Sequence, residues 1–139
     1  MTEKHIKYRS GYKYQLAEDY KIRTSIKPKA AIDTQFIALS AAGALTVKSG
    51  YAWDGTSGPV IDTDHNLRAS LVHDALYQLM RQKKLSRKQY KDKADKLFKT
   101  LCKQDGVRAV RAHVYYLALK KLGNPATDPK NAKEVKQAP

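Results

Sequence analysis

The stretch SLVHDALYQLM, residues 70–80, places an imidazole and a carboxylate side by side, at His73 and Asp74, among apolar side chains. In such surroundings an imidazole can exchange protons near neutral pH, and a carboxylate can hold a cation. The two side chains lie about 100° apart around a helix, so they cannot serve one purpose symmetrically. We expect one of them to face a neighbouring helix and the other to face a nearby loop.

A second carboxylate, Asp95, lies at the border of another apolar stripe. On a helix it lies beside Phe98, whereas Asp92 faces lysines and is an ordinary solvated acid. Asp95 needs a partner, because burying a carboxylate unpaired is costly. We therefore predict that it contacts His73, orients the ring and stabilises the imidazolium that forms when His73 takes a proton. Tyr77, one turn after His73, is expected to donate a hydrogen bond to Asp95.

The loop YAWDGTSGP, residues 51–59, precedes the helix that carries Asp74. Backbone carbonyls of a glycine-rich loop, together with a carboxylate, form an oxygen shell that suits a hard cation such as calcium. A cation there could polarise a carbonyl while His73 activates water. The candidate calcium ligands are Asp74, Tyr51, Asp54, Gly55 and Gly58.

Each of these features also has a purely structural explanation. A lone histidine on an apolar helix is commonly a hydrogen-bonded core residue, and a glycine-rich loop before a helix is commonly only a turn. Asp95 could instead form a structural ion pair with Arg68 or Arg111. Only the combination of groups favours a site.

The elements that would position these groups fall into a β part and a helical part. Alternation of apolar and polar residues predicts β structure over residues 5–53, with hairpins about Ser10–Gly11 and Ala42–Gly43. Over residues 62–123 the apolar period becomes that of three helices, the third being VRAVRAHVYYLALKKL.

Helix ends are marked by short signals. Ser86 followed by Gln89 is a capping box at the start of the second helix, and Asp105–Gly106 ends that helix. The short connection before Ser86 predicts that the first two helices pack antiparallel. Three residues could cap the first helix: Asp62, Thr63 and Asp64.

Strands first and helices afterwards predict an α+β fold. It comprises N-terminal antiparallel β hairpins followed by three helices, two of which form an antiparallel pair that carries the HD and AD motifs. We expect a single domain over residues 1–125 and a flexible tail over residues 126–139, which lack apolar periodicity.

Composition limits the possible partners, the cysteine chemistry and the cellular location of the protein. The net charge of +14 on 139 residues favours partners that carry phosphate, whether nucleic acid or an anionic membrane surface. One cysteine excludes an internal disulfide and a cysteine-rich zinc site. The polar N-terminus predicts no signal peptide, and no apolar run is long enough for a transmembrane segment. A soluble protein made in a reducing cytoplasm is expected.

HDALY followed by ADKLF, with His73 and Asp95 separated by 22 positions, resembles the secreted-type, calcium-dependent phospholipases. The similarity is greatest to their compact version in parvovirus capsid proteins and covers roughly residues 51–101. The resemblance implies that His73 activates water, Asp74 binds calcium and Asp95 orients His73, with Tyr77 bracing Asp95. The loop departs from the family pattern, because WDGTSGP replaces a GxG-like core and adds Asp54.

The run GYAWDGTSGP…LVHDALY also resembles a group of small phage and prophage proteins without an established activity, over most of the chain. This resemblance implies a protein of the host cytoplasm, or one associated with a virion. Three functions follow as hypotheses. The first is a His/Asp, calcium-assisted hydrolase of phospholipid esters that works on an anionic membrane. The second is a non-enzymatic phage protein that is structural or binds host or other phage proteins. A nucleic-acid binder is less favoured, because the lysines lack interleaved aromatic residues and no nucleic-acid-binding motif is present.

Overall fold

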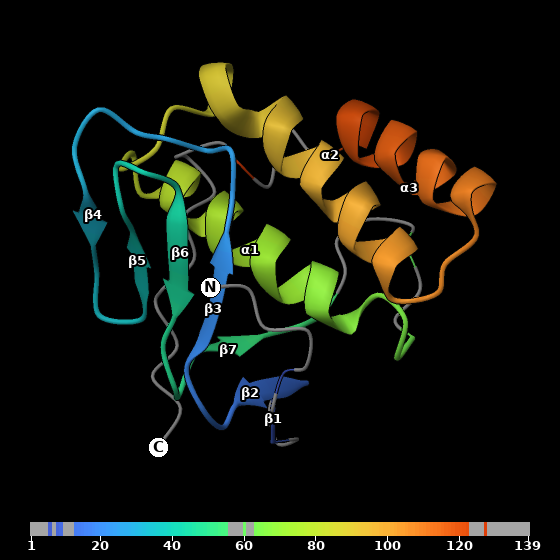
Figure 1. The fold of residues 1–139 in the computed structure, drawn as a ribbon, viewed down its shortest axis with the longest axis horizontal. Helices are drawn as coiled ribbons and strands as arrows, with labels where there is room; N and C mark the ends of the chain where they lie inside the picture. Colours follow the sequence, from blue (N-terminus) through green and yellow to red (C-terminus); the bar gives the residue numbers. More distant parts are fainter. Residues whose placement is uncertain are drawn as a thin grey trace. The chain divides into compact units, whose positions relative to one another are not determined.

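The computed structural model describes residues 6, 8–9, 13–55, 60, 63–122 and 127. In this part of the chain, strands β1 to β7 precede helices α1 to α3 (Figure 1), which confirms the predicted α+β order. The chain divides into two compact units: a β unit that ends at Asp54 and a helical unit that begins at Gly55. The expected single domain over residues 1–125 stays a prediction.

The β unit contains two antiparallel sheets. The first has the strand order β1-β2-β7 and the second has the order β3-β6-β5-β4. Alternation along β3 continues into the following loop, so that the side chains of one face are buried. The strands are β1 (Tyr8–Arg9), β2 (Tyr14–Leu16), β3 (Tyr20–Arg23), β4 (Ile32–Asp33), β5 (Ile37–Leu39), β6 (Ala44–Val47) and β7 (Ala52–Trp53). The buried residues of that face are Tyr20, Ile22, Thr24 and Ile26.

The hairpin predicted about Ala42–Gly43 is confirmed, since β5 and β6 pair antiparallel on either side of it. Gly43 has φ +92°, and a Cβ at this position would lie 2.2 Å from the backbone oxygen of Thr24. Thr24 also donates to the Gly43 carbonyl through its backbone N–H and its hydroxyl. The turn therefore requires glycine. The turn expected at Ser10–Gly11 lies outside the described residues, although β1 and β2 pair antiparallel.

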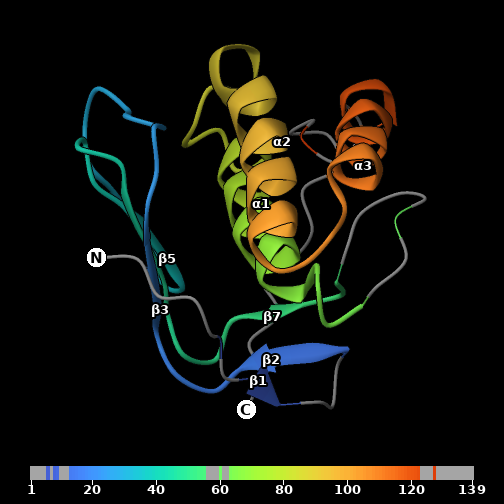
Figure 2. The same ribbon diagram turned by 45° about the vertical axis from the view of Figure 1, so that its right-hand side comes forward.

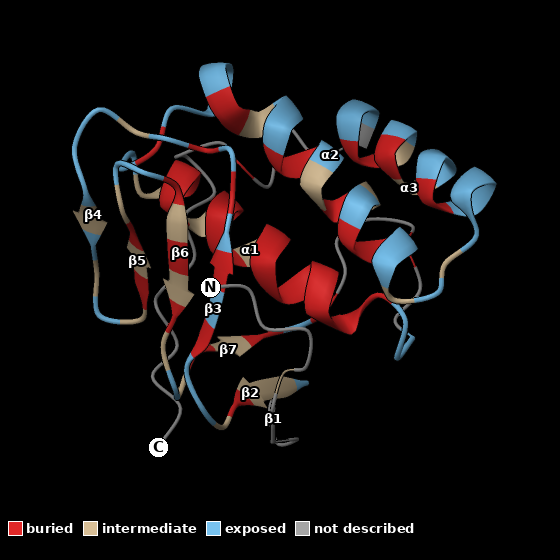
Figure 3. Ribbon diagram, viewed as in Figure 1, coloured by how far each residue is buried: buried red, intermediate tan, exposed pale blue. Residues whose placement is uncertain are grey.

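The helical unit consists of α1 (Leu67–Arg81), α2 (Arg87–Gln104) and α3 (Ala109–Leu122). α2 lies between α1 and α3 and runs antiparallel to both (Figure 1, Figure 2). α1 is buried over most of its circumference, whereas α2 and α3 each expose one side (Figure 3). An apolar stripe that continues around much of a helix is typical of such a buried helix. No helix in the described ranges is both long enough and apolar enough to cross a bilayer.

The capping box of α2 is present, because the hydroxyl of Ser86 accepts a hydrogen bond from the backbone N–H of Gln89 at 3.2 Å. The predicted cap of α1 was wrong for Thr63 and Asp64. The chain makes a turn first, so Asn66 occupies the N-cap position, and its side chain accepts from the Thr63 N–H at 2.9 Å. Asp62 lies outside the described residues.

The end of α2 at Gln104 agrees with the predicted break at Asp105–Gly106. α3 begins at Ala109, two residues later than the apolar pattern indicated. The reason is that the Val107 N–H donates to the carbonyl of Cys102 and completes the end of α2.

Candidate functional site

The facing sides of α1 and α2 bring His73 and Asp95 together. Nε2 of His73 lies 2.7 Å from Oδ1 of Asp95, so the predicted contact is present. His73 is 2% exposed and Asp95 is 0% exposed. The contact is possible because each residue lies at the edge of its helix's apolar stripe, and the antiparallel packing of the helices brings these edges together.

Tyr77 lies one turn after His73 on the same side of α1. Its hydroxyl donates to Oδ1 of Asp95 at 2.5 Å, as predicted. The ring centroids of His73 and Tyr77 are 3.9 Å apart, and Phe98 meets the imidazole edge-on at 5.3 Å. Burial, followed by the negative charge of Asp95, raises the pKa of Tyr77 far above its ordinary value. The phenol therefore stays protonated and acts as a hydrogen-bond donor.

Lys91 is the partner that the sequence analysis missed. Its Nζ lies 2.8 Å from Oδ2 of Asp95 and 3.0 Å from the carbonyl oxygen of Leu119 in α3. The available signal was the spacing of four residues between Lys91 and Asp95, which places them on one side of a helix. Arg68, considered as an alternative partner of Asp95, instead binds Asp105 through Nε and Nη2 at 2.9 and 3.0 Å.

The surroundings of Asp95 favour its ionised form. Burial alone would raise its pKa, but the hydrogen bond and charge of His73, with further hydrogen bonds from Lys91 and Tyr77, lower the pKa below its ordinary value. An ionised carboxylate only accepts hydrogen bonds, so Nε2 of His73 carries a proton and donates it. In the neutral ring, Nδ1 then holds the lone pair. Nδ1 forms no hydrogen bond with any residue that the structure describes.

The expected calcium ligands belong to different parts of the chain. Asp74 is half-buried in α1 and already interacts with other groups of the protein. Gly55 is buried with φ +87° at the start of the helical unit, whereas Tyr51 and Asp54 belong to the β unit. Gly58 lies outside the described residues.

Metal binding by side chains alone has no candidate in the described ranges, where no three imidazole, thiol or carboxylate groups cluster. The expected site depends chiefly on backbone carbonyls, to which that observation does not apply. Its donors are all oxygen atoms, and such a donor set fits calcium.

A family model described as "Protein of unknown function (DUF1353)" matches residues 30–119. The matched segment contains β4 to β7, α1, α2 and most of α3, and so includes the cluster formed by His73, Tyr77, Lys91 and Asp95. Neither a curated protein nor a solved structure matches the chain. Because the match covers well over half of its length, the chain belongs to the DUF1353 family of proteins of unknown function.

Proposed function

We propose that this protein hydrolyses phospholipid esters with His73 as the general base. The observation that carries the proposal is the hydrogen bond between Nε2 of His73 and the ionised carboxylate of Asp95. It fixes the tautomer in which Nδ1 can accept a proton, which is the state that a general base needs. Tyr77 and Lys91 hold the carboxylate in place, so the orientation of the ring is set before a substrate arrives.

The reaction would begin with a water molecule beside Nδ1 of His73. Nδ1 removes one proton as the water oxygen attacks the ester carbonyl carbon, and Asp95 stabilises the resulting imidazolium. When the tetrahedral intermediate collapses, the bond from carbon to the alcohol oxygen breaks. The leaving oxygen takes the proton from Nδ1, which restores the neutral ring and yields a fatty acid and a lysophospholipid.

Calcium is part of this proposal. Asp74 and the oxygen atoms of the 51–59 loop would hold the ion, and these donors have the chemistry that calcium prefers. When bound, the ion would polarise the ester carbonyl and offset the negative charge of the lipid phosphate. Titration calorimetry of the wild type and of Asp74→Asn tests this part. Equal or absent heats of binding in the two proteins would remove calcium from the proposal.

The proposed substrate is an anionic phospholipid of a membrane. The net charge of +14 supports it, because a strongly cationic protein concentrates at an anionic surface. A phage protein that acts in the host cytoplasm or from the virion, alone or with other phage proteins, would meet such a membrane during entry or lysis.

The experiment is fatty-acid release from phosphatidylglycerol vesicles in the presence of calcium. His73→Gln should lower the rate about 10²–10⁴-fold, since glutamine fills similar space but cannot take the proton. Asp95→Asn should lower it less, because the base remains. Asp92→Asn is the matched control for Asp95→Asn, because this exposed aspartate lies one turn earlier in α2 and outside the cluster. A wild-type protein that hydrolyses none of several anionic phospholipids would refute the proposal.

The depth of the cluster supports a second candidate, a non-enzymatic phage protein that uses these helices as a scaffold. His73 is 2% exposed, and Lys91 extends the hydrogen-bond network from α2 to the α3 carbonyl of Leu119. A network of this kind can serve stability alone. This candidate expects no hydrolysis by the wild type, and a lower melting temperature for both His73→Gln and Asp95→Asn.

A further inference from the structure

The outer face of α3 is apolar although it faces solvent. Val110, Val114 and Leu117 recur with helical spacing and are 79%, 55% and 49% exposed. The opposite face of the same helix is also apolar, and it is buried through Ala112, Tyr116 and Leu119. α3 thus has more apolar surface than its packing in the helical unit uses. A contiguous exposed apolar stripe of this kind marks an interaction surface.

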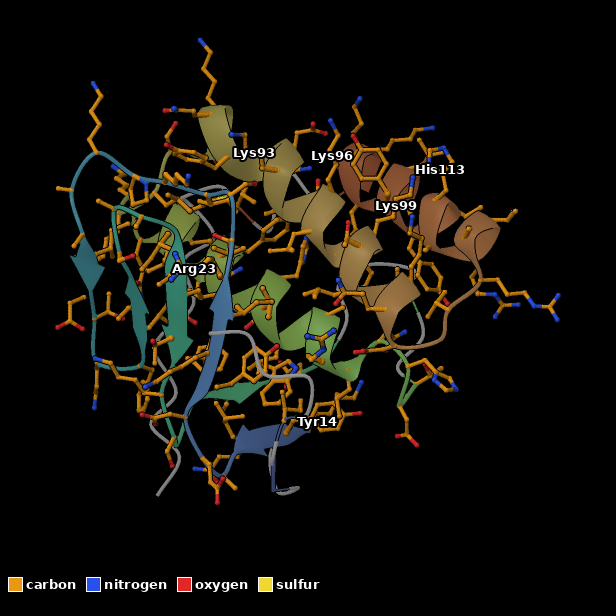
Figure 4. All side chains as sticks on the ribbon, in the orientation of Figure 1. Tyr14, Arg23, Lys93, Lys96, Lys99 and His113 are labelled. Carbon is orange, nitrogen blue, oxygen red and sulfur yellow. The ribbon has the colours of Figure 1, made fainter. Side chains whose placement is uncertain are left out.

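The charged side chains that α3 itself places beside this stripe are positive. Arg111 flanks it on one side and Lys120 on the other; α3 contains no acidic residue. Lys121 continues the stripe toward the C-terminal end of the helix. On α2, Lys99 donates to His113 at 3.0 Å and brings a further cation to this side (Figure 4).

A pocket of about 250 Å³ lies at the N-terminal end of α3, and Arg108, Arg111, Tyr115 and His65 contribute to its lining. The carboxylate of Asp105, which precedes the lining residue Gly106, is already bound by Arg68. Neither Arg108 nor Arg111 has an acidic partner in the described part of the chain. The pocket therefore offers unpaired guanidinium groups, which bind phosphate well.

We propose that the outer face of α3 is the surface by which this protein docks on an anionic phospholipid bilayer. The three aliphatic side chains enter the hydrocarbon boundary, while Arg111, which flanks the stripe, and Lys121, which continues it, bind lipid phosphates. An apolar stripe bordered by cations is the pattern by which interfacial helices bind such membranes. The inference deepens the proposed function and rests on it for the choice of a lipid partner.

The charge pattern disfavours other occupants of this face. A second copy of the chain would bring the same cations against each other. A nucleic acid would satisfy the cations but provides no hydrocarbon for Val110, Val114 and Leu117, so the apolar side chains would gain nothing.

The test is cosedimentation of the full chain with phosphatidylglycerol–phosphatidylcholine vesicles in EDTA, where the proposed calcium-assisted hydrolysis cannot consume the lipid. We expect binding that weakens with salt and is lost on pure phosphatidylcholine. The triple variant Val110→Gln, Val114→Gln, Leu117→Gln should lower the partition coefficient about tenfold or more. Glutamine is a good helix former, so circular dichroism should show an unchanged fold.

Charge position is tested with Arg111→Gln against Lys29→Gln, which removes the same charge from an exposed site in the β unit. Arg111→Gln should weaken vesicle binding more than Lys29→Gln does. No binding by the wild type, or equal binding by the triple variant, would overturn the docking proposal. The two proposals fail separately: vesicle binding without any hydrolysis refutes only the activity. Hydrolysis of a soluble short-chain ester with vesicle binding unchanged in the triple variant refutes only the docking surface.

Discussion

Replacing Asp95 by asparagine is the sharpest test of the cluster's energetics. The side chain is fully buried and accepts three hydrogen bonds, two at Oδ1 from His73 and Tyr77 and one at Oδ2 from Lys91. Asparagine keeps one oxygen and presents an amide N–H₂ in place of the other, so at least one donor would face another donor. Removing one member of a buried ion pair typically costs about 3–5 kcal/mol. We expect that loss in the free energy of unfolding for Asp95→Asn.

The matched control is Asp92→Asn, the same substitution one turn earlier in α2. The Asp92 side chain is 49% exposed and is bound by Lys96 at 3.0 Å and by the hydroxyl of Tyr116. Exposed pairs contribute up to about 1 kcal/mol, so this variant should remain close to the wild type. Urea unfolding monitored by circular dichroism measures both. If the two variants differ by less than about 1 kcal/mol, the view that Asp95 is a buried, ionised hub is wrong.

Three further predictions rest on separate features. The pKa of Asp95 is lowered in the folded protein, so its contribution to the stability of the fold should be complete at neutral pH. That contribution should be lost only as the pH falls below about 4, the ordinary carboxyl range. The urea unfolding midpoints of the wild type and Asp95→Asn should therefore converge in acid. Burial raises the pKa of the Cys102 thiol to about 12, so a thiol reagent should label the native protein far more slowly than the unfolded protein, and equal rates would contradict the burial. Gly43→Ala should lower the free energy of unfolding by at least about 2 kcal/mol, because the new Cβ would meet the Thr24 backbone. Gly50→Ala is also at positive φ, but its Cβ would meet only the Phe36 ring, so it should lower the stability less. Thermal unfolding measures both variants.

The sequence was sufficient where a local pattern determines the structure. Apolar periodicity located the three helices, and the Ser86 and Gln89 pair marked the start of α2 because a capping box is complete within four residues. The contact between His73 and Asp95 could be predicted because two amphipathic helices joined by a short connection must pack antiparallel, which brings the borders of their apolar stripes together.

The sequence was not sufficient for features that depend on distant residues or that the local pattern leaves open. The position of Lys91 beside Asp95 depends also on a second hydrogen bond, which Lys91 donates to the Leu119 carbonyl, 28 residues away in the sequence. Asn66 takes the N-cap position because the turn before α1 uses its side chain to bind Thr63, a choice that the local sequence leaves open among several capping residues. The exposed apolar face of α3 was also missed. The helix is apolar on two sides, so periodicity alone does not tell which side is buried.

The bridge through Lys91 links the ionisation of Asp95 to the position of α3. If α3 moved along α2, the Leu119 carbonyl would lose its hydrogen bond from Lys91. Lys91 would then be held less firmly beside the buried carboxylate of Asp95, whose charge it neutralises. Thermodynamic linkage is reciprocal, so an event that displaces α3 must change the proton affinity of Asp95, and neutralising Asp95 must loosen α3 by the same free energy. Amide hydrogen exchange should report this coupling as faster exchange along α3 in Asp95→Asn than in Asp92→Asn. Equal protection of α3 in the two variants would show that the bridge transmits nothing.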